Sequence, residues 1–344
     1  MNASWQTHLA AQGASFPDEF SVRFGEDERQ GASLVAQGTV VVPLEHLRVI
    51  RATGEDAGAF LHNLFSNDVK KLGANEAQLN SFNSPKGRML ASMLVWRQGS
   101  DYLLAMSADI HAAMLKKLSM YVLRSKVRLL DDGSDSVLIG LAGSQAGAAL
   151  EAAGLGIPGA PRATASGIAS VVRLDGARFV VSTPISEAAA LWNKFVASGA
   201  VPAGTQAWQW LDIREGLPTV TQPVQEEFVA QMLNFDLIGG VSFNKGCYPG
   251  QEIVARTHYL GKLKKRMYRV HAPVGALPAV GTDIYAPDFG DQSAGKVVSA
   301  APAPEGGYDA LVVLQSSSAD AGQAHLGAPD GPALAFLPLP YALG

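Results

Sequence analysis

The chain contains very little cysteine: Cys247 is the single one among 344 residues. One cysteine cannot form an internal disulfide framework, and it cannot alone supply the ligands of a cysteine-rich metal or iron–sulfur site. The seven histidines show no HExxH or HxxxH spacing of the kind that indicates a zinc site. We therefore expect a cytoplasmic protein, kept in a reducing compartment, with no resident metal ion.

Long hydrophobic runs are also missing. The apolar stretches fall far short of the roughly 20 residues that cross a bilayer. The first basic residue, Arg23, comes too late for the charged start of a secretory signal. We expect no membrane association. Because 47% of the residues are hydrophobic and 17% are charged, the composition is that of a globular protein, and the length predicts two or three domains.

Charge is distributed unevenly. The whole chain carries a net charge of −4, but residues 245–271 alone carry +6, which leaves −10 for the rest. The basic residues of this segment, with Glu252 as its lone acid, are Lys245, Arg256, Lys262, Lys264, Lys265, Arg266 and Arg269. Such a segment predicts a local anionic ligand or partner, and a solvated, lysine-rich pair of strands is the alternative. Direct nucleic-acid binding is not expected, because it would favour a wider basic face.

Hydrophobic periodicity predicts an α+β fold. A strand-like run at 44–50 leads through Gly54 into a helical pattern, and 136–150 repeats this strand–turn–helix order. From about Met267 onward, short strand-like pieces between turn residues predict a small antiparallel barrel or sandwich. The other expected elements are hairpins at 78–97 and 171–181, a strand near 102, and helices at about 109–124 and 186–198.

Two glycine-containing motifs lack the context of the signatures they resemble. The run 154–159 fits GxGxxG, but it follows a helical pattern and contains a proline, which predicts a helix stop rather than a dinucleotide site. The run 143–147 does not have the GxSxG frame of a nucleophile elbow. We interpret its Ser144 as a helix N-cap.

Cys247 lies in the run KGCYPGQE, Lys245–Glu252. Glycines at 246 and 250 permit a tight loop, and the nearby Lys245 would favour the thiolate, which is the nucleophilic and metal-binding form of cysteine. The alternative is a small buried hydrophobic residue, as lone cysteines often are. We select Cys247 and Lys245 as the candidate catalytic residues.

The longer run Gly239–Arg266, GGVSFNKGCYPGQEIVARTHYLGKLKKR, resembles the signature of the YgfZ-like proteins. These are relatives of the glycine-cleavage T-protein and include a mitochondrial iron–sulfur assembly factor. Supporting matches lie at 51–69, at 83–88 (NSPKGR) and at 208–218 (WQWLDIREGLP). Together these motifs span most of residues 44–270.

The resemblance implies a T-protein-like clover-leaf of three domains around a folate site. Residues 1–265 would form the aminomethyltransferase-like folate-binding region, built from two interleaved α+β subdomains, the second at about 136–205. Residues 266–344 would form the C-terminal antiparallel β-barrel. The implied cofactor is tetrahydrofolate or a derivative, and its expected contacts are Trp208, Tyr248 and Arg256. Trp208 has an alternative role, as a core residue at helical spacing with Leu211.

The implied role is that of a monomeric accessory protein for the assembly or repair of iron–sulfur clusters, with an indirect effect on tRNA modification. Its expected partners are folate and iron–sulfur client enzymes or assembly proteins. Leu90 and Ala91 stand where the enzyme relative carries an acidic pair, and Met232, or else Gln231, stands where it carries a pterin-binding Glu. Without a proton-transferring group, ordinary aminomethyltransferase turnover is not expected.

Two other functions remain open at this point. The first is a folate-dependent one-carbon transferase or demethylase that uses Cys247 or a base supplied by the substrate. The second is an RNA-associated module that acts in tRNA thiolation.

Overall fold

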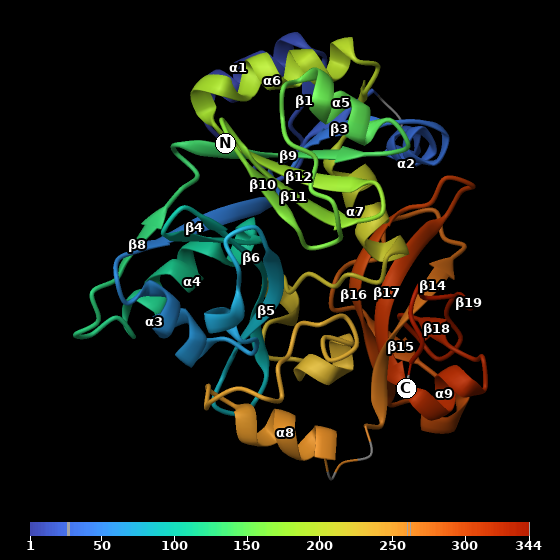
Figure 1. The fold of residues 1–344 in the computed structure, drawn as a ribbon. Coiled ribbons are helices and arrows are strands. Elements are labelled where there is room, and N and C mark those ends of the chain that lie inside the picture. The colour runs from blue at the N-terminus through green and yellow to red at the C-terminus, as the bar shows by residue number, and fades with distance from the viewer. Residues whose placement is uncertain (26–27, 260, 262, 344) are drawn as a thin grey trace. The chain divides into compact units, whose positions relative to one another are not determined.

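The computed structural model describes residues 1–25, 28–259, 261 and 263–343. The chain forms two compact units (Figure 1). Unit 1 comprises Met1–His62, Val69–Gln78 and Met93–Trp208, and unit 2 comprises Asn63–Asp68, Leu79–Ser92 and Gln209–Gly344. The elements that the boundary crosses are α3 (Ala57–Leu64), β5 (Ala77–Asn83), β6 (Met89–Gln98) and α7 (Thr205–Arg214).

A six-stranded sheet of order β10-β11-β12-β9-β3-β13 forms the centre of unit 1. All neighbouring strands are antiparallel except β13 and β3, which are parallel. The strands are β3 (Val40–Pro43), β9 (Ser136–Ala142), β10 (Thr164–Ser166), β11 (Ser170–Asp175), β12 (Arg178–Pro184) and β13 (Val201–Pro202). Because β9 lies in the middle of the sheet, its run of Val, Leu and Ile is buried almost throughout, as a strand covered on both faces requires.

Helices α1 (Ala3–Ala11), α5 (Ala146–Ala152) and α6 (Ile185–Ala197) cover one face of this sheet (Figure 1). Their buried side chains, which include Trp5, Leu150 and Trp192, form one core with the strand residues Ile139 and Val181. The remaining elements of unit 1 are β1 (Ala14–Ser15), β2 (Arg23–Phe24), α2 (Glu28–Gln37), β4 (Leu47–Thr53), η1 (Val69–Lys71), β7 (Asp101–Ser107), α4 (Ala108–Ser119) and β8 (Arg128–Asp131).

The strand–turn–helix repeat predicted from the sequence is present. Gly54 follows β4 at φ +110°, and Gly143 follows β9 at φ +122°. In both copies the amide three residues later donates to the glycine carbonyl, over 3.1 Å from Ala57 and 3.0 Å from Ala146. A Cβ at either glycine would lie 2.1 or 2.2 Å from a backbone oxygen, so only glycine fits the turn.

Three local predictions can be compared with the structure. Helix α5 stops as expected: Gly154 has φ +80°, and the Leu155 amide donates to the Leu150 carbonyl in a Schellman-type end. The prediction that Ser144 is the N-cap is wrong, because Gln145 occupies that position and its amide is bound by the Thr39 hydroxyl oxygen. The helix expected to reach 124 ends at Ser119 instead.

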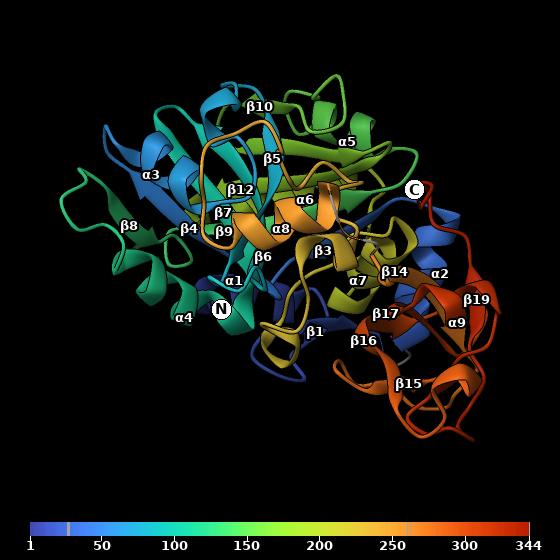
Figure 2. The ribbon, with the colours of Figure 1, turned by 90° about the horizontal axis from the view of Figure 1, so that it is seen from below.

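Unit 2 contains the C-terminal sheet, of order β18-β15-β16-β17-β14-β19 (Figure 2). Every neighbouring pair in it is antiparallel, as predicted from Met267 onward. Since β18 and β19 are its two margins, the sheet is a half-barrel. The elements of unit 2 are η2 (Gln222–Val224), η3 (Ala230–Leu233), α8 (Gln251–Tyr259), β14 (Lys265–Ala272), β15 (Asp283–Tyr285), η4 (Pro287–Phe289), β16 (Ser293–Pro302), β17 (Tyr308–Gln315), α9 (Ser316–Asp320), β18 (His325–Leu326) and β19 (Ala335–Leu337).

Candidate functional site

The loop that carries Cys247 lies against the hairpin turn at 84–87 in unit 2. Gly250 has φ +75°, and a Cβ there would lie 2.5 Å from both the Gly87 Cα and the Ser84 carbonyl oxygen. Gly87, at φ +72°, is equally restricted, because its Cβ would lie 2.8 Å from the Ile253 Cβ. These close backbone approaches require glycine on both sides. The contact fixes the end of the loop where α8 begins.

Cys247 itself is a free, exposed cysteine on this loop. A buried packing role, the alternative left open by the sequence, is therefore excluded. An exposed thiol can reach a ligand, an oxidant or a partner protein.

Lys245 and Tyr248 brace the inner side of the loop. The Lys245 Nζ donates to the Phe65 carbonyl oxygen and lies 4.8 Å from the centroid of the Tyr248 ring, in a cation–π contact. Tyr248 is only 6% exposed, and burial raises the pKa of its hydroxyl above the usual range. Neither of these two contacts of Lys245 involves the Cys247 sulfur. They hold the ammonium in place while the thiol faces outward.

Several buried polar atoms next to this loop have no hydrogen-bond partner among the described residues. They are both side-chain atoms Oδ1 and Nδ2 of Asn83, the Ser84 Oγ and the Gln231 Oε1. Gln231 is 2% exposed, and its Nε2 donates to the Val254 carbonyl of α8 over 2.6 Å. Buried polar groups are normally paired, so an unpaired set indicates an absent water or ligand.

The sequence does not assign Asn83 or Ser84 to a site, and it gives Gln231 only as the second choice after Met232. Met232 was preferred over Gln231 as the counterpart of the pterin-binding Glu, but Gln231 is the buried polar residue. In the sequence, Asn83 and Ser84 are distinguished only by the NSPKGR match. Polar residues entering a hairpin turn are too common to be assigned to a site from sequence alone.

Trp208 lies in the core of unit 1, at 1% exposure. Its six-membered ring packs so closely on β9 that a Cβ at Gly140 would lie 2.5 Å from its Cζ3 atom. The Arg178 guanidinium lies 5.4 Å from the ring centroid, and its Nε donates to Asp175 over 2.6 Å. The structure therefore supports the core role that the sequence left open for Trp208, and it gives the ring no exposed face for a folate contact.

Three of the seven basic side chains of the segment 245–271, those of Lys245, Arg266 and Arg269, are engaged within unit 2. Arg266 forms a two-point pair with Asp236, over 2.7 and 3.0 Å, and also donates to the Gln231 carbonyl oxygen. Arg269 pairs with the buried Asp309 over 2.9 Å. The expectation that these two arginines face an anionic ligand is wrong, because acids distant in sequence neutralise them. Lys262 lies outside the described residues.

Arg256 and Lys264 are the exposed cations of the segment. Arg256 lies in the last turn of α8, the helix that begins directly after the Cys247 loop. Its position allows a role at the edge of a site near the loop, and a folate contact remains a prediction.

Leu90 and Ala91 lie on β6 in unit 2 and are 5% and 0% exposed. The Gln225 Nε2 donates to the Leu90 carbonyl over 2.7 Å. Two apolar side chains in this position can neither donate nor accept a proton.

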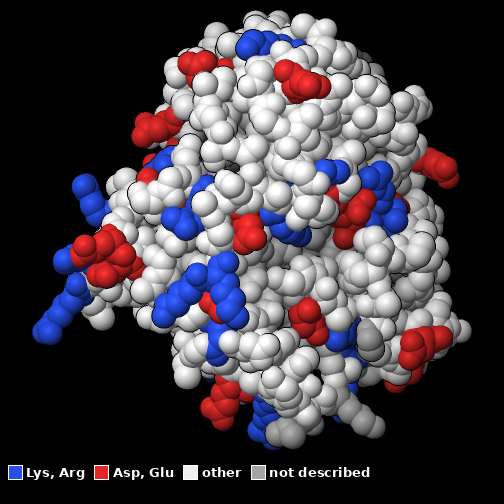
Figure 3. All heavy atoms as spheres, in the orientation of Figure 1, with Lys and Arg blue, Asp and Glu red and all other residues white. Residues whose placement is uncertain are grey.

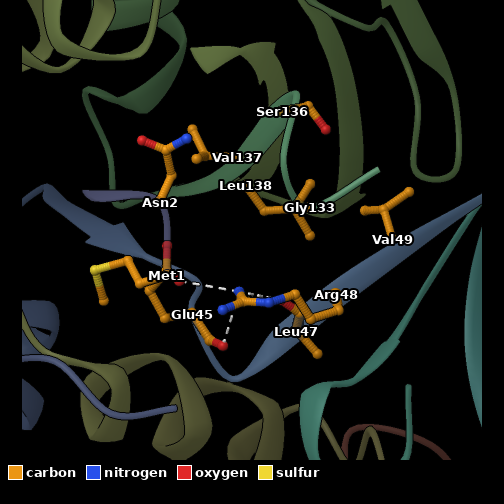
Figure 4. Close-up of a pocket in the computed structure, with 10 residues that line it drawn as sticks. All are labelled: Met1, Asn2, Glu45, Leu47, Arg48, Val49, Gly133, Ser136, Val137 and Leu138. Atoms are coloured by element: carbon orange, nitrogen blue, oxygen red, sulfur yellow. Dashed lines mark hydrogen bonds and ion pairs between the residues drawn. The ribbon is translucent and has the colours of Figure 1, made fainter. Parts of the chain in front are cut away.

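Two partly open pockets lie among the described residues of unit 1. One has a volume of about 20 Å³, which is room for a water molecule, and lies beside the ion pair between Arg48 and Glu45 (Figure 4). The other, of about 160 Å³, is lined by residues that include Arg23, Gly31 and Thr205. Neither contains Cys247, Lys245, Tyr248 or Arg256.

In the parts of the chain that the structure describes, no cluster of three or more His, Cys, Asp and Glu side chains could hold a metal ion. None of the described helices has the length and apolarity needed to cross a bilayer.

Comparison with known proteins places this chain in a family. The model of the GCVT N-terminal domain matches residues 8–156. A "tRNA-modifying protein YgfZ" of Cronobacter sakazakii is 31% identical over 74% of this chain and 78% of its own. One of Sodalis glossinidius is 29% identical over 88% and 93%. The crystal structure of glycine cleavage system aminomethyltransferase T from Bartonella henselae covers 98% of this chain and 96% of its own with a TM-score of 0.80 and 17% identity, which shows a common fold. The chain belongs to the YgfZ family, built on the fold of the glycine-cleavage T-protein.

Proposed function

We propose that this protein is a folate-binding accessory factor for the assembly or repair of iron–sulfur clusters in client enzymes. Cys247 would be its transient thiolate ligand or nucleophile. The observation that carries the proposal is the exposed thiol on a loop that Gly250 fixes against the turn at 84–87. A rigid loop presents the sulfur at a defined place, so a partner protein can approach it without first ordering the chain.

A single thiolate suits a cluster in transit better than a stored cluster. Iron–sulfur clusters are held by several thiolates, and this chain can supply one, so the other ligands must come from a carrier or client protein. The soft Cys247 sulfur would replace one ligand of the cluster iron, and the displaced ligand would leave with its partner. No electron transfer is needed for this exchange. The ammonium of Lys245, held by Phe65 and Tyr248, would add positive charge near an anionic thiolate.

The unpaired atoms of Asn83, Ser84 and Gln231 fit a reduced folate. A pterin ring presents N–H donors and nitrogen and oxygen acceptors along its edges, and these three side chains offer both donors and acceptors. A reduced folate supplies nitrogen atoms that can accept a one-carbon unit. Here Leu90 and Ala91 cannot assist such a transfer, which favours binding without aminomethyltransferase turnover.

The folate proposal is tested by calorimetric titration of the purified protein with tetrahydrofolate. Replacing Gln231 by Leu should weaken binding about tenfold, since one buried hydrogen bond contributes on the order of 1.4 kcal/mol. The matched control is Met232→Leu, which should leave the affinity unchanged. Absence of binding at millimolar folate, or equal affinities for the two variants, would rule out the proposed contact.

The role of Cys247 is tested in a strain that lacks the native gene. The strain is complemented with the wild type, Cys247→Ser or Cys247→Ala at matched protein levels, and the activity of an iron–sulfur enzyme is measured. Serine is nearly isosteric but is a poor nucleophile and soft-metal ligand at neutral pH. Both variants should therefore fail to restore activity while keeping the wild-type melting temperature. Full rescue by Cys247→Ser would show that the function does not need the Cys247 thiol.

An effect on tRNA modification would follow indirectly. Some enzymes that modify tRNA depend on iron–sulfur clusters, so losing the factor would lower their products without any contact between this chain and RNA. We therefore expect purified tRNA not to bind the chain at physiological salt. Tight binding of tRNA at physiological salt would favour a direct RNA-associated role instead.

A further inference from the structure

The segment between α4 and β8 in unit 1 is strongly basic. From residue 110 to residue 130 there is no acid, whereas five basic residues are present: Lys116, Lys117, Arg124, Lys126 and Arg128. Lys126 pairs with Glu55, and no carboxylate of the described residues pairs with the other four. Figure 3 shows Lys and Arg side chains extending at the left margin of the molecule, where Figure 1 places this segment, with acidic side chains beside them.

The same segment exposes apolar side chains. Met120 is 63% exposed, Leu123 is 88% exposed, and Tyr121 is 40% exposed. Leu123 also has φ +44°, a left-handed conformation that is rare for a residue with a branched side chain. This conformation costs free energy and exposes the Leu123 side chain to water. Both properties are typical of a residue that contacts a partner protein.

The base of the segment is firmly built, so the exposure of its tip is not a sign of disorder. The Asp56 Oδ2 accepts a hydrogen bond from the Lys126 amide over 2.7 Å. Gly54 lies so close that a Cβ there would be 2.1 Å from the Lys126 carbonyl oxygen. Turn hydrogen bonds from Tyr121 to Leu118 and from Ser125 to Val122 continue this order to the tip.

Strand β8 adds an open backbone edge. The sheet order β5-β6-β7-β4-β8 makes β8 a margin strand, paired only with β4 among the described strands. Its Leu130 is 41% exposed and follows the exposed Arg128. An unpaired strand edge offers N–H and C=O groups that another polypeptide can complete by strand addition.

We propose that this surface, formed by Lys116, Met120, Leu123, Arg124, Arg128 and Leu130, docks an acidic segment of a partner protein. Apolar side chains of the partner would cover Met120 and Leu123, and its carboxylates would face Lys116, Arg124 and Arg128. Two features select a polypeptide over RNA or an anionic membrane. The open edge of β8 is complementary to backbone, and the exposed apolar side chains of Met120 and Leu123 between the cations match apolar side chains that a phosphate backbone does not offer.

The test uses the full chain with a photo-crosslinking amino acid in place of Leu123, expressed in the strain that lacks the native gene. The matched control carries the same amino acid at Ile168, which is 54% exposed elsewhere in unit 1. Light should give a discrete adduct at position 123 that is sensitive to protease and resistant to nuclease. Mass spectrometry should find the crosslinked segment rich in Asp and Glu, with apolar residues among them.

A synthetic peptide of that crosslinked segment then tests affinity on the purified protein. Combined Lys116→Glu and Arg124→Glu should weaken binding about tenfold or more, because charge reversal replaces attraction with repulsion. The control Lys70→Glu, at another exposed lysine of unit 1, should leave it unchanged. In the crosslinking experiment, the proposal is overturned if no adduct forms at position 123, if the adduct contains only RNA or lipid, or if the crosslinked segment contains no acidic residues. In the binding experiment, it is overturned if the charge reversal leaves the peptide affinity unchanged. Recruitment to phosphatidylglycerol vesicles through Leu123 would also overturn it.

Discussion

Two basic segments of this chain have opposite surroundings. Residues 245–271 have the larger charge by sequence, yet Arg266 and Arg269 are held by Asp236 and Asp309, acids that lie 30 and 40 residues away. Residues 116–128 carry a slightly smaller net charge in the sequence, yet four of their five basic side chains have no carboxylate partner in the described structure. Charge counted along a chain therefore does not show which cations are available to a ligand. Folding decides this by bringing distant acids to some of them.

The largest difference between the segments should appear in stability. Replacing Arg266 by Met leaves the mostly buried Asp236 without its partner, and such a change costs about 3–5 kcal/mol of the free energy of unfolding. The matched change Arg124→Met removes an exposed cation and should stay within about 0.5 kcal/mol. Urea unfolding of the purified variants measures both. Equal losses would mean that the two segments do not differ as described.

The loop at the start of the first segment should be nearly as sensitive. Gly250→Ala places a methyl group 2.5 Å from the Gly87 Cα at a φ of +75°, so we expect a loss of about 2 kcal/mol or more. The rate at which Cys247 is alkylated should also change, because the loop must shift. Gly159→Ala, where a Cβ meets no atom within 4 Å, is the control and should leave both quantities unchanged. A Gly250→Ala protein with wild-type stability and alkylation rate would contradict the fixed loop.

A smaller effect concerns pH. Burial, followed by the nearby cations Lys296 and Arg88, lowers the pKa of Lys265 below its ordinary value of 10.5. Between the lowered pKa and 10.5 the unfolded chain binds more protons than the folded one, so this lysine makes stability rise with pH in that window. Lys265→Gln should flatten the rise and stabilise the protein at neutral pH. The exposed neighbour Lys264, changed to Gln, should do neither, and identical pH profiles for the two variants would count against the assignment.

The smallest effect is expected for the surface between α4 and β8. Combined Lys116→Glu and Arg124→Glu should change the free energy of unfolding by less than about 0.5 kcal/mol, since exposed side chains without ion pairs contribute little to the fold. Thermal unfolding at low and high salt provides the measurement. A loss of more than about 2 kcal/mol would show that these cations serve the fold of unit 1, as Arg266 serves unit 2.

Much of the fold could be predicted because local signals agree with it. The glycine after each repeated strand and the helix stop at Gly154 are recognisable from their own residue type and position, although the contacts that require glycine at 54 and 143 come from residues far away in sequence. The antiparallel C-terminal sheet followed from strand-length pieces separated by turn residues. Helix α4 ends at Ser119, and the left-handed Leu123 beyond it could not be predicted, because leucine rarely adopts that conformation.

The candidate site could be predicted only in part. The glycines around Cys247 indicated a tight loop, and an exposed thiol on that loop is what the structure shows. The burial of Trp208 could be raised only as an alternative, because it depends on Gly140 and Arg178, which belong to strands far away in sequence. The same holds for Gln231, whose unpaired oxygen is visible only when its surroundings are known.

The central claim, that Cys247 takes part in cluster transfer, is tested most directly with purified components. An iron–sulfur enzyme stripped of its cluster is mixed anaerobically with a cluster-loaded carrier protein, tetrahydrofolate and either the wild-type chain or Cys247→Ser, and the return of activity is followed over time. We predict that the wild type accelerates recovery, whereas Cys247→Ser, with unchanged melting temperature and folate affinity, does not. Equal acceleration by the two proteins would contradict the claim.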